Sequence, residues 1–526
     1  MIEKYYSGVI EQIYNRIGKE TRNIVMANYS NDFSIENLEV IRRYQSNEDN
    51  VFFAYSEFSY NTLVGAYEPF LDIICNMHRR FIGGSFDDFQ KECGVYYLHR
   101  QVLNSYYETG ECFREETVLL NEVAYEQRRM TMAIADMLKK LSEVKPLMIV
   151  INRFQMASKS SIETIKYLID NPCANIGIVL GVNAIVKGTD STVEVWDRIV
   201  ESLEDRSAIY YIGSAGPLKN NVKTTNDDEL YITMNFEQSI QEASNIMEFL
   251  DFEQARRGCR IIEHKLKFED AWIDEKSLRR FYMVYARTSV LLGEMSKAIE
   301  LTNEYKALIP ENDSEHYLSL YYFMKGTCYM YQGKLEKAGN SAKSAYDYAV
   351  LAEDDTLIFK AELLSVMIKM SGWYNIFFCV QDIPVSDEII EKLIKHGYRN
   401  HLAHIYIYAY DNSRDVVKQS FYDESLLKHF TKGLELAKEI GNEQLVYDAY
   451  QKTIMLASTS GLNEIAFLYV IRTYEFMKGH GNIYVARVLT SIGYNLSAMG
   501  KNELVDNYYN AAINMLYYLK MPEDIA

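Results

Sequence analysis

The sequence is short of the residues that cross-link a chain or carry it through a membrane. Its seven cysteines stand singly, without any C-x-x-C pair, which argues against a disulfide framework and a zinc ribbon. No apolar run reaches the roughly 18 residues that a membrane span needs. The first twenty residues also lack the apolar block of a signal peptide. We therefore expect a cytoplasmic chain without a membrane partner.

Basic residues are outnumbered, with 55 lysines and arginines against 73 acids and a net charge of −18. The longest basic clusters are two residues and recur among acids, so no basic face is available to a long polyphosphate. We expect no direct nucleic-acid partner. His396, His401 and His404 lie close together, but no acid or cysteine nearby completes a ligand set, so we expect no metal.

The length of 526 residues suggests two to four domains. Up to about residue 215, apolar strand-like runs alternate with stretches whose apolar residues recur every three or four positions. The strand-like runs are 22–27, 50–58, 146–151, 175–182 and 207–213. This alternation predicts an α/β domain with a mainly parallel, doubly wound sheet.

After a polar loop around 215–230, helical periodicity continues almost unbroken, and it contains a repeat of about 40 residues. Each copy places aromatic or small residues at fixed distances around a turn glycine, an arrangement similar to a tetratricopeptide repeat. The four copies are Tyr282, Ala286, Gly293, Ala298 and Pro310; Tyr322, Gly326, Tyr329, Gly333, Ala338 and Ala345; Tyr450, Gly461 and Ala466; and Leu489, Gly493, Gly500 and Ala512. The small residues let paired helices approach, and the glycines permit a positive φ at the turn. We predict an all-α tetratricopeptide-repeat solenoid.

The stretch "KPLMIVINRFQMASKSSIETIKYLID" at 145–170 follows a long amphipathic helix, and Tyr67, Pro69 and Phe70 open another helix upstream. Together these segments resemble the signal-transduction ATPases with numerous domains (STAND), AAA-like enzymes whose corresponding strand ends in two acids. The resemblance implies a P-loop NTPase-like domain at 21–215, after an N-terminal helix at 1–20. A helical connector at 216–270 and the repeat domain at 271–526 would follow.

The catalytic residues of that family are missing. A phosphate-binding loop with glycines and a lysine should follow the first strand, yet 28–37 reads "NYSNDFSIEN". "RIGKET" at 16–21 supplies a Gly-Lys pair but precedes the strand, and we interpret it as a helix end. Asn152 and Arg153 stand where acids would hold Mg²⁺, and Asn183 stands near the usual sensor arginine. The degenerate cleft thus comprises Asn28, Asp32, Ser34, Asn152, Arg153 and Asn183. We expect no cofactor and no enzymatic activity, that is, a pseudo-ATPase.

The concave groove of such a solenoid is lined by the first helix of each repeat. The groove residues predicted from the repeat frame are Arg280, Met283 and Arg287; Phe323, Thr327 and Met330; and Arg487 and Tyr494. An apolar groove with a few arginines suits an extended or helical peptide with an acidic flank. Contact with a neighbouring domain of the same chain is an equally open interpretation.

Our leading hypothesis is a non-catalytic cytoplasmic adaptor or regulatory protein of bacterial type. It would bind a protein or peptide partner through its repeats and self-associate through the α/β part, as the resemblance implies. One alternative is a STAND-class switch that still binds a nucleotide without Mg²⁺, with Arg153 supplying the charge. Another is a transcription regulator of the maltose-activator type, which would need a partner to supply the DNA-binding domain.

Overall fold

The computed structural model describes most of the chain, and the description below is confined to those residues. They are 2–29, 38–46, 50–59, 63–114, 116, 122–183, 193–204, 206, 208–212, 235–268, 273–312, 314–374, 387–409, 424–459, 461–477 and 482–518. The chain divides into two compact units, Met1–Cys328 and Tyr329–Ala526. The boundaries predicted from the sequence, after residues 20, 215 and 270, stay predictions. None of the helices described here is long and apolar enough to span a membrane.

The first unit contains a five-stranded sheet in which every pairing is parallel, in the order β2-β3-β4-β1-β5. The strands are β1 (Ile24–Tyr29), β2 (Phe52–Glu57), β3 (Leu147–Asn152), β4 (Ile176–Asn183) and β5 (Ile209–Ile212). Each coincides with one of the strand-like runs, so the predicted fold class is confirmed. All residues of β3 and β4 are buried, which is why both read as continuous apolar runs.

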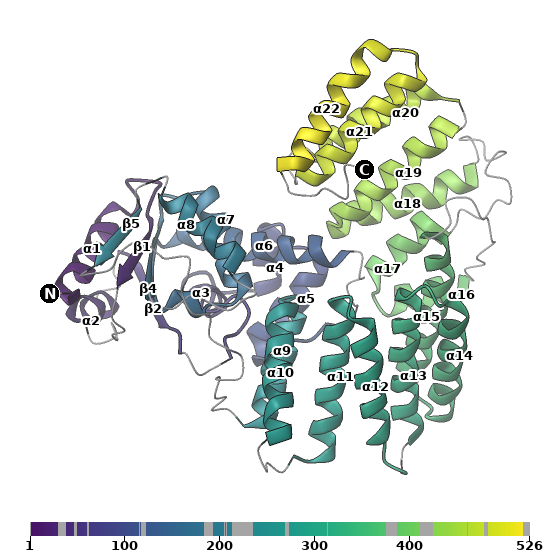
Figure 1. Ribbon diagram of the computed structural model, residues 1–526, viewed down its shortest axis with the longest axis horizontal. Coiled ribbons are helices and arrows are strands. Elements are labelled where there is room, and N and C mark those ends of the chain that lie inside the picture. Colours follow the sequence, from purple (N-terminus) through teal and green to yellow (C-terminus); the bar gives the residue numbers. More distant parts are fainter. Residues whose placement is uncertain are drawn as a thin grey trace. The chain divides into compact units, whose positions relative to one another are not determined.

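Helices cover both faces of this sheet (Figure 1). On one face, α1 (Ile2–Arg16) and α2 (Glu39–Ser46) pack their apolar sides against alternate residues of the strands. On the other lie α7 (Lys159–Asp170) and α8 (Val193–Glu204). The chain runs one way along the sheet from β1 to β2 and the other way from β2 to β5. Right-handed crossovers then place their helices on opposite faces.

Two glycines of β4 let α1 lie close to the sheet. A Cβ at Gly177 would stand 2.9 Å from Ile17 Cδ1. A Cβ at Gly181 would stand 2.5 Å from the Tyr6 hydroxyl and 2.7 Å from Asn152 Oδ1. Contacts this short do not occur for real Cβ atoms, so any larger residue would push α1 away. The end of α1 at Arg16, followed by Gly18 at φ 78°, confirms that "RIGKET" closes a helix.

A helical insertion lies between β2 and β3. Its elements are α3 (Phe70–Met77), the π-helical turn η1 (His78–Ile82), α4 (Phe86–Glu92), α5 (Tyr97–Thr109) and α6 (Val123–Val144). Helix α3 begins directly after Tyr67 and Pro69, as predicted. After β3, the short 3₁₀ helix η3 (Phe154–Met156) leads to α7, whose N-terminus is capped by the Ser158 side chain.

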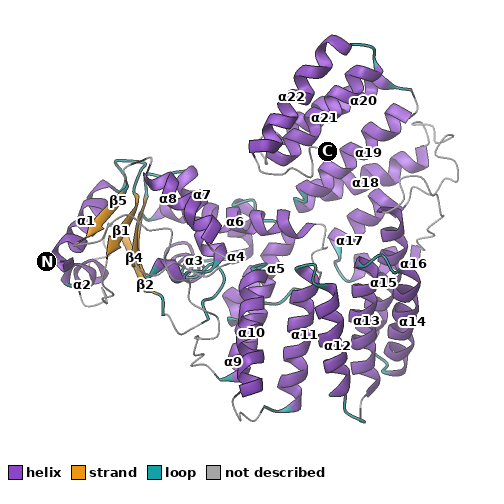
Figure 2. Cartoon of the chain, in the orientation of Figure 1, coloured by secondary structure: helices purple, strands orange, loops and turns teal. Residues whose placement is uncertain are grey.

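The remainder of the described chain is helical, whereas the strands are confined to the first part (Figure 2). The first unit continues with α9 (Phe236–Glu248), α10 (Phe252–Phe268), α11 (Glu275–Leu291), α12 (Met295–Ala307) and α13 (Ser314–Tyr331), which crosses into the second unit. The second contains α14 (Leu335–Leu351), α15 (Asp355–Tyr374), α16 (Asp387–Lys395), α17 (Arg399–His404), η5 (Ile405–Ala409), α18 (Glu424–Ile440), α19 (Glu443–Thr459), α20 (Asn463–Met477), α21 (Asn482–Ala498) and α22 (Asn502–Tyr518).

The turn glycines of all four predicted repeats lie between consecutive helices. Gly293, Gly333, Gly461 and Gly500 have φ values of 77°, 71°, 75° and 74°, the left-handed region that favours glycine. At the crossing of α21 and α22, a Cβ on Gly493 would stand 2.8 Å from the Tyr509 ring. The repeat frame is therefore confirmed at its turns and at this helix crossing. The predicted helical solenoid is present.

Candidate functional site

Parallel sheets bind ligands at the carboxyl ends of neighbouring strands whose connections leave in opposite directions. Here those strands are β1 and β4, because the chain leaves β1 towards β2 and leaves β4 towards β5. Tyr29 ends β1, Asn183 ends β4, and Asn152 ends the adjacent β3. The structure thus brings Asn28, Asn152, Arg153 and Asn183 to one edge of the sheet. Asp32 and Ser34 lie outside the described residues.

Asn28, Asn152 and Asn183 are all buried at this edge, and Asn152 and Asn183 bond to neighbouring residues of the chain. Asn152 is 0% exposed, and its Oδ1 accepts a hydrogen bond of 2.7 Å from the Tyr29 hydroxyl. The Tyr29 ring in turn meets the Tyr6 ring edge-on, with centroids 6.5 Å apart. The Asn183 backbone N–H donates to Gln155 Oε1 over 3.3 Å. The Asn152 side-chain oxygen, which could have faced Mg²⁺, is therefore satisfied inside the fold.

Arg153 is also held by the chain itself. Its backbone adopts φ 55°, a left-handed conformation that is uncommon outside glycine. Its Nη1 lies 3.0 Å from Glu57 Oε1 and donates to the Phe58 carbonyl over 3.4 Å. The Tyr55 hydroxyl donates to the second oxygen of Glu57. The Arg153 guanidinium thus has a carboxylate from the end of β2 beside it.

Sequence reasoning missed Glu57. The signal was available, because Glu57 is the next-to-last residue of the strand-like run 50–58 and its polar side chain interrupts the apolar pattern. What the sequence did not provide was the pairing of β2 with β3, which sets Glu57 opposite Asn152 and next to Arg153. Tyr6 was missed as well. Burial, followed by the nearby Tyr29, raises the pKa of Tyr6 well above its ordinary value, so its hydroxyl stays protonated at neutral pH.

The first helical hairpin, α9 and α10, is bonded directly to the segment that follows this edge. The turn between the two helices carries Asp251, which is 5% exposed. Its Oδ2 accepts a hydrogen bond of 3.0 Å from the Ser160 backbone N–H at the start of α7. Gln254 donates to the Val64 carbonyl over 2.9 Å, and Arg114 Nη2 donates to the Glu248 carbonyl over 2.6 Å. We call this set of contacts the seam; the sequence did not predict it. Because α7 starts soon after Arg153, the seam bonds the first helical hairpin to the segment that follows the carboxyl edge.

The seam borders a cavity of 310 Å³ to which three carboxylates contribute. Glu68 precedes α3, Asp72 lies in its first turn, and Glu242 comes from α9. Burial, and then the charges of Glu68 and Asp72, raise the pKa of Glu242 to about 7. This shift favours the neutral form of Glu242, which relieves the repulsion between the three groups.

Within the first unit, the predicted groove arginines contact α9. Arg280 donates to Gln241 Oε1, and Arg287 Nη2 lies 2.9 Å from Glu248 Oε1. Met283, which lies on α11 with these two arginines, is half-buried. Helix α9 thus packs beside α11 as a preceding repeat helix would, inside the segment that the sequence identified only as a connector. For these two arginines, the structure shows the contact within the chain that the sequence analysis left open.

The remaining groove residues are distributed over α13 and α21. Phe323 and Thr327 are half-buried on α13, and the Thr327 hydroxyl donates to the Phe323 carbonyl over 2.9 Å. Met330, at the end of that helix, is 7% exposed. Tyr494 on α21 is 60% exposed. Arg487 lies in the same helix, but its side chain is outside the described set. Tyr494 therefore presents a largely exposed aromatic ring on α21.

The three histidines that are close in the sequence take part in packing. His396 stacks on Phe359 with ring centroids 4.5 Å apart. His401 and His404 are 3% and 1% exposed. Over the part of the chain that the structure describes, no group of three histidine, cysteine or acidic residues could hold a metal ion.

Comparison with known proteins gives similarities to solved structures. No protein-family model and no curated protein matches the chain. A STAND protein with a tetratricopeptide repeat sensor from Pyrococcus horikoshii is 12% identical, and the match covers 97% of this chain and 88% of that one, with a TM-score of 0.46. Aspartyl phosphate phosphatase F from Bacillus subtilis is 10% identical over 83% of this chain and 96% of that one, with a TM-score of 0.34.

A Rap protein complexed with competence and sporulation factor is 15% identical over 54% of this chain and 76% of that one, with a TM-score of 0.35. The chain is thus similar to a solved STAND protein, the family that the sequence resembles. Its fold class is established by its own parallel sheet and helical repeats.

Proposed function

We propose that this chain is a non-catalytic regulatory protein in which a pseudo-ATPase platform carries a tetratricopeptide solenoid that binds a protein partner. The observation that carries the first part is the state of the sheet's carboxyl edge. Asn152 is bonded to Tyr29, and Arg153 is paired with Glu57. Both positions that would serve Mg²⁺ in an ATPase are engaged by neighbours in the fold.

The chemistry of phosphoryl transfer supports this proposal. Hydrolysis needs a metal ion held by carboxylates, and a loop of backbone N–H groups with a lysine around the phosphates. Asn152 is neutral, so it offers a metal less than a carboxylate would, and Arg153 would repel a divalent cation. The sequence 28–37 contains neither glycine nor lysine. A chain altered at both places keeps the sheet as a scaffold and loses the reaction.

The partner-binding part of the proposal depends on the repeats. Tetratricopeptide solenoids present the first helix of each repeat along one surface, which receives extended or helical peptides. Tyr494 on α21 offers a large exposed ring there, and tyrosine is among the residues that most often anchor interfaces. Arg280 and Arg287 are already engaged by α9, so we assign the partner to the later repeats.

Two assays test the proposal on the full-length chain. The first measures phosphate release from ATP with Mg²⁺, and release at the background rate is expected. The second compares retention of a co-purifying partner by the wild type, Tyr494→Ala and Tyr346→Ala. Tyr346, on α14, is 38% exposed and stands outside the predicted groove positions, so it is the matched control. Loss of the partner in Tyr494→Ala alone supports the proposal, whereas equal retention by all three chains contradicts it.

The nucleotide-binding switch remains the second candidate, because Arg153 keeps 21% of its side chain exposed at this edge. Such a switch would bind ATP without Mg²⁺, using Arg153 in place of the metal's charge. Binding that disappears in Arg153→Ala would favour it over the scaffold. Release of phosphate would contradict both.

A further inference from the structure

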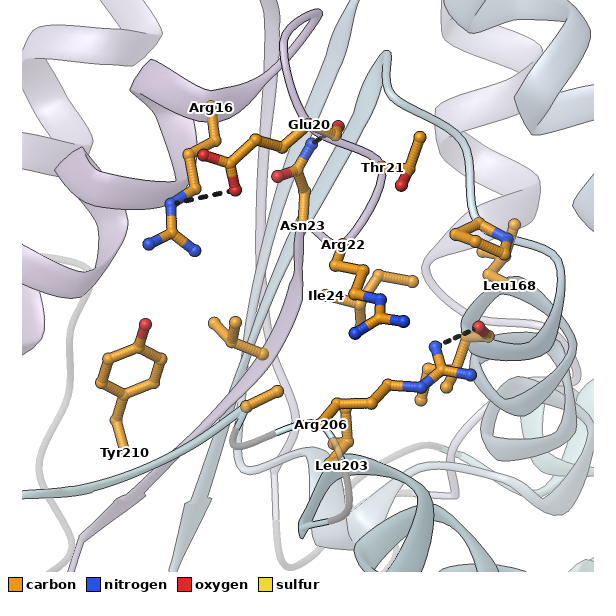
Figure 3. Close-up of a pocket in the computed structure, with 14 residues that line it drawn as sticks. Arg16, Glu20, Thr21, Arg22, Asn23, Ile24, Leu168, Leu203, Arg206 and Tyr210 are labelled. Carbon is orange, nitrogen blue, oxygen red and sulfur yellow. Dashed lines mark hydrogen bonds and ion pairs between the residues drawn. The ribbon is translucent and has the colours of Figure 1, made fainter.

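A pocket lies at the opposite, amino edge of the sheet, where the sequence analysis predicted no site (Figure 3). It has a volume of 210 Å³. Its walls come from the end of α1, the segment leading into β1, the last turns of α7 and α8, and the start of β5. It is separate from the cleft at the carboxyl edge, because it lies at the other end of the same strands.

The pocket is basic although the chain is acidic. Arg16, Arg22 and Arg206 line it together with one acid, Glu20, so the lining carries a net positive charge in a chain of net charge −18. Arg16 Nε lies 3.6 Å from Glu20 Oε2, and Arg206 Nη1 donates to the Ile169 carbonyl over 2.5 Å. Within the described part of the chain, Arg22 makes neither a hydrogen bond nor an ion pair.

Helix capping explains only part of this arrangement. Arginines are favourable at helix C-termini, where they bond the last carbonyls and offset the negative end of the helix dipole. Arg16 ends α1, and Arg206 bonds a carbonyl in the last turn of α7, so capping accounts for both. It does not account for Arg22, which precedes β1. Figure 3 shows that the guanidinium groups of Arg22 and Arg206 reach into the same part of the pocket.

Two guanidinium groups cannot relieve their repulsion by losing a proton, because arginine stays charged in proteins. An anion between them would turn that repulsion into attraction. The Arg206 guanidinium has five N–H donors and uses one of its nitrogens for Ile169, so others are available to a ligand. The planar forks of arginine match the oxygens of phosphate groups.

The frame around the pocket is fixed before any ligand arrives. The Gly18 N–H donates to the Ala174 carbonyl over 2.8 Å. The Asn23 side-chain amide donates to the carbonyls of Glu20, over 2.7 Å, and Ala174, over 3.2 Å. On the other wall, the Ala208 N–H donates to the Leu203 carbonyl over 2.9 Å. A site organised in this way spends little free energy on ordering its walls when a ligand binds.

The size and lining define the ligand further. The volume lies below the roughly 300 Å³ at which pockets for drug-sized ligands begin, so the ligand is small. Leu168, Leu203 and Tyr210 supply apolar surface next to the arginines, which suits the carbon skeleton of a metabolite. We propose that this pocket binds a small phosphomonoester of the sugar phosphate class, with its phosphate between Arg22 and Arg206.

The experiment uses the full-length chain, titration calorimetry and thermal unfolding, with ribose 5-phosphate, inorganic phosphate and ribose as probes. Ribose 5-phosphate is expected to bind and to raise the unfolding temperature, whereas ribose without its phosphate does neither. Binding of inorganic phosphate without binding of ribose 5-phosphate would identify the ligand as a free anion. That result would overturn the sugar phosphate assignment.

Two variants locate the site. Arg22→Ala is expected to weaken binding roughly tenfold or more, since it removes charged hydrogen bonds to the phosphate. Lys19→Ala is the matched control, because it removes one positive charge from the same end of the sheet without touching the pocket lining. Arg22→Ala removes no contact with the described residues, so this variant should fold. Equal weakening in both variants, loss of binding in Arg153→Ala instead, or no binding at millimolar ligand would overturn the proposal.

Discussion

The two ends of the parallel sheet handle polar side chains in opposite ways. At the carboxyl edge, Asn152 and Arg153 are engaged by Tyr29 and Glu57 within the fold. At the amino edge, Arg22 has no partner among the described residues, and it shares a 210 Å³ pocket with two further arginines. Parallel sheets ordinarily place ligands at the carboxyl edge. Here Asn152 and Arg153 at that edge are engaged within the fold, whereas the arginine without a described partner, Arg22, lies at the other end.

This difference separates two explanations for a polar residue at the end of a strand. A residue that completes a hydrogen bond or ion pair inside the fold contributes to stability, so its removal should unfold the chain more easily. A residue left without a partner contributes little stability, so its removal should alter binding alone.

The 310 Å³ cavity beside the seam also brings like charges together, those of Glu68, Asp72 and Glu242. Unlike arginines, these carboxylates can relieve their repulsion by protonation. Glu242 has its pKa raised from 4.5 to about 7, so the folded state prefers the neutral acid. The stability from that preference is complete below pH 4.5 and is lost as the pH rises through 7. Glu242→Gln should therefore be more stable than the wild type by up to about 3 kcal/mol at pH 8.

Urea unfolding of both chains at pH 4.5 and pH 8 measures this difference. At pH 4.5 the two chains should be close in stability, because the wild-type acid is then neutral in the folded state. A difference that does not change between the two pH values would show that the cavity does not hold Glu242 in its neutral form.

Gly181→Ala tests the close packing at the carboxyl edge. The new methyl group would meet the Tyr6 hydroxyl and Asn152 Oδ1, so a loss of about 2 kcal/mol in the free energy of unfolding is expected. Gly8→Ala, on α1 with Tyr6 and with no atom within 4 Å of the added Cβ, is the control. It should be neutral or stabilising by roughly 0.5 kcal/mol. Denaturant titrations measure the free energy of unfolding of both variants. Equal changes would show that the close approach of α1 does not restrict the residue at position 181.

Glu57→Gln breaks the ion pair at the carboxyl edge. It leaves the Arg153 charge without its carboxylate at a site where the two side chains are 21% and 16% exposed. Roughly 1–2 kcal/mol of destabilisation is expected. A double-mutant cycle with Arg153→Gln, measured by urea unfolding, isolates the coupling between the two. Additive effects would mean that the pair does not hold Arg153 in place.

Tyr29→Phe removes only the hydroxyl that donates to Asn152. The carboxamide oxygen then loses its donor at a fully buried position, which should cost about 1 kcal/mol. Thermal unfolding monitored by circular dichroism would detect this change. Unchanged stability in this variant would indicate that the Asn152 oxygen is satisfied by another group.

Arg22→Ala should change stability by less than about 0.5 kcal/mol, since no described contact is lost. This is the smallest effect predicted, and it is the stability counterpart of the binding loss expected for the same variant. Chemical denaturation without ligand measures it. A loss of 1 kcal/mol or more would place Arg22 among the structural residues, together with Arg153.

Local patterns in the sequence predicted the fold well. The five apolar runs become the five strands, and Gly293, Gly333, Gly461 and Gly500 mark turns with positive φ. Apolar runs and turn glycines carry information about their immediate neighbours only. This is why strand order, and with it the pairing of Glu57 with Arg153, was beyond reach.

The seam and the amino-edge pocket escaped prediction for the same reason. Asp251 belongs to no sequence motif, and only the fold places it at the start of α7. Arg16, Arg22 and Arg206 come from three separate segments and belong to no motif. Arg280 and Arg287, predicted from the repeat frame as groove residues, lie on α11, and the sequence did not reveal that α9 contacts them.

The most direct test of the central claim is calorimetric titration of the full-length chain with ATP and ADP, with and without Mg²⁺, beside a phosphate-release assay. A carboxyl edge at which Asn152 and Arg153 are engaged by Tyr29 and Glu57 predicts no Mg²⁺-dependent binding and no release. Micromolar binding that requires Mg²⁺, together with measurable phosphate release, would contradict the account and restore an active ATPase.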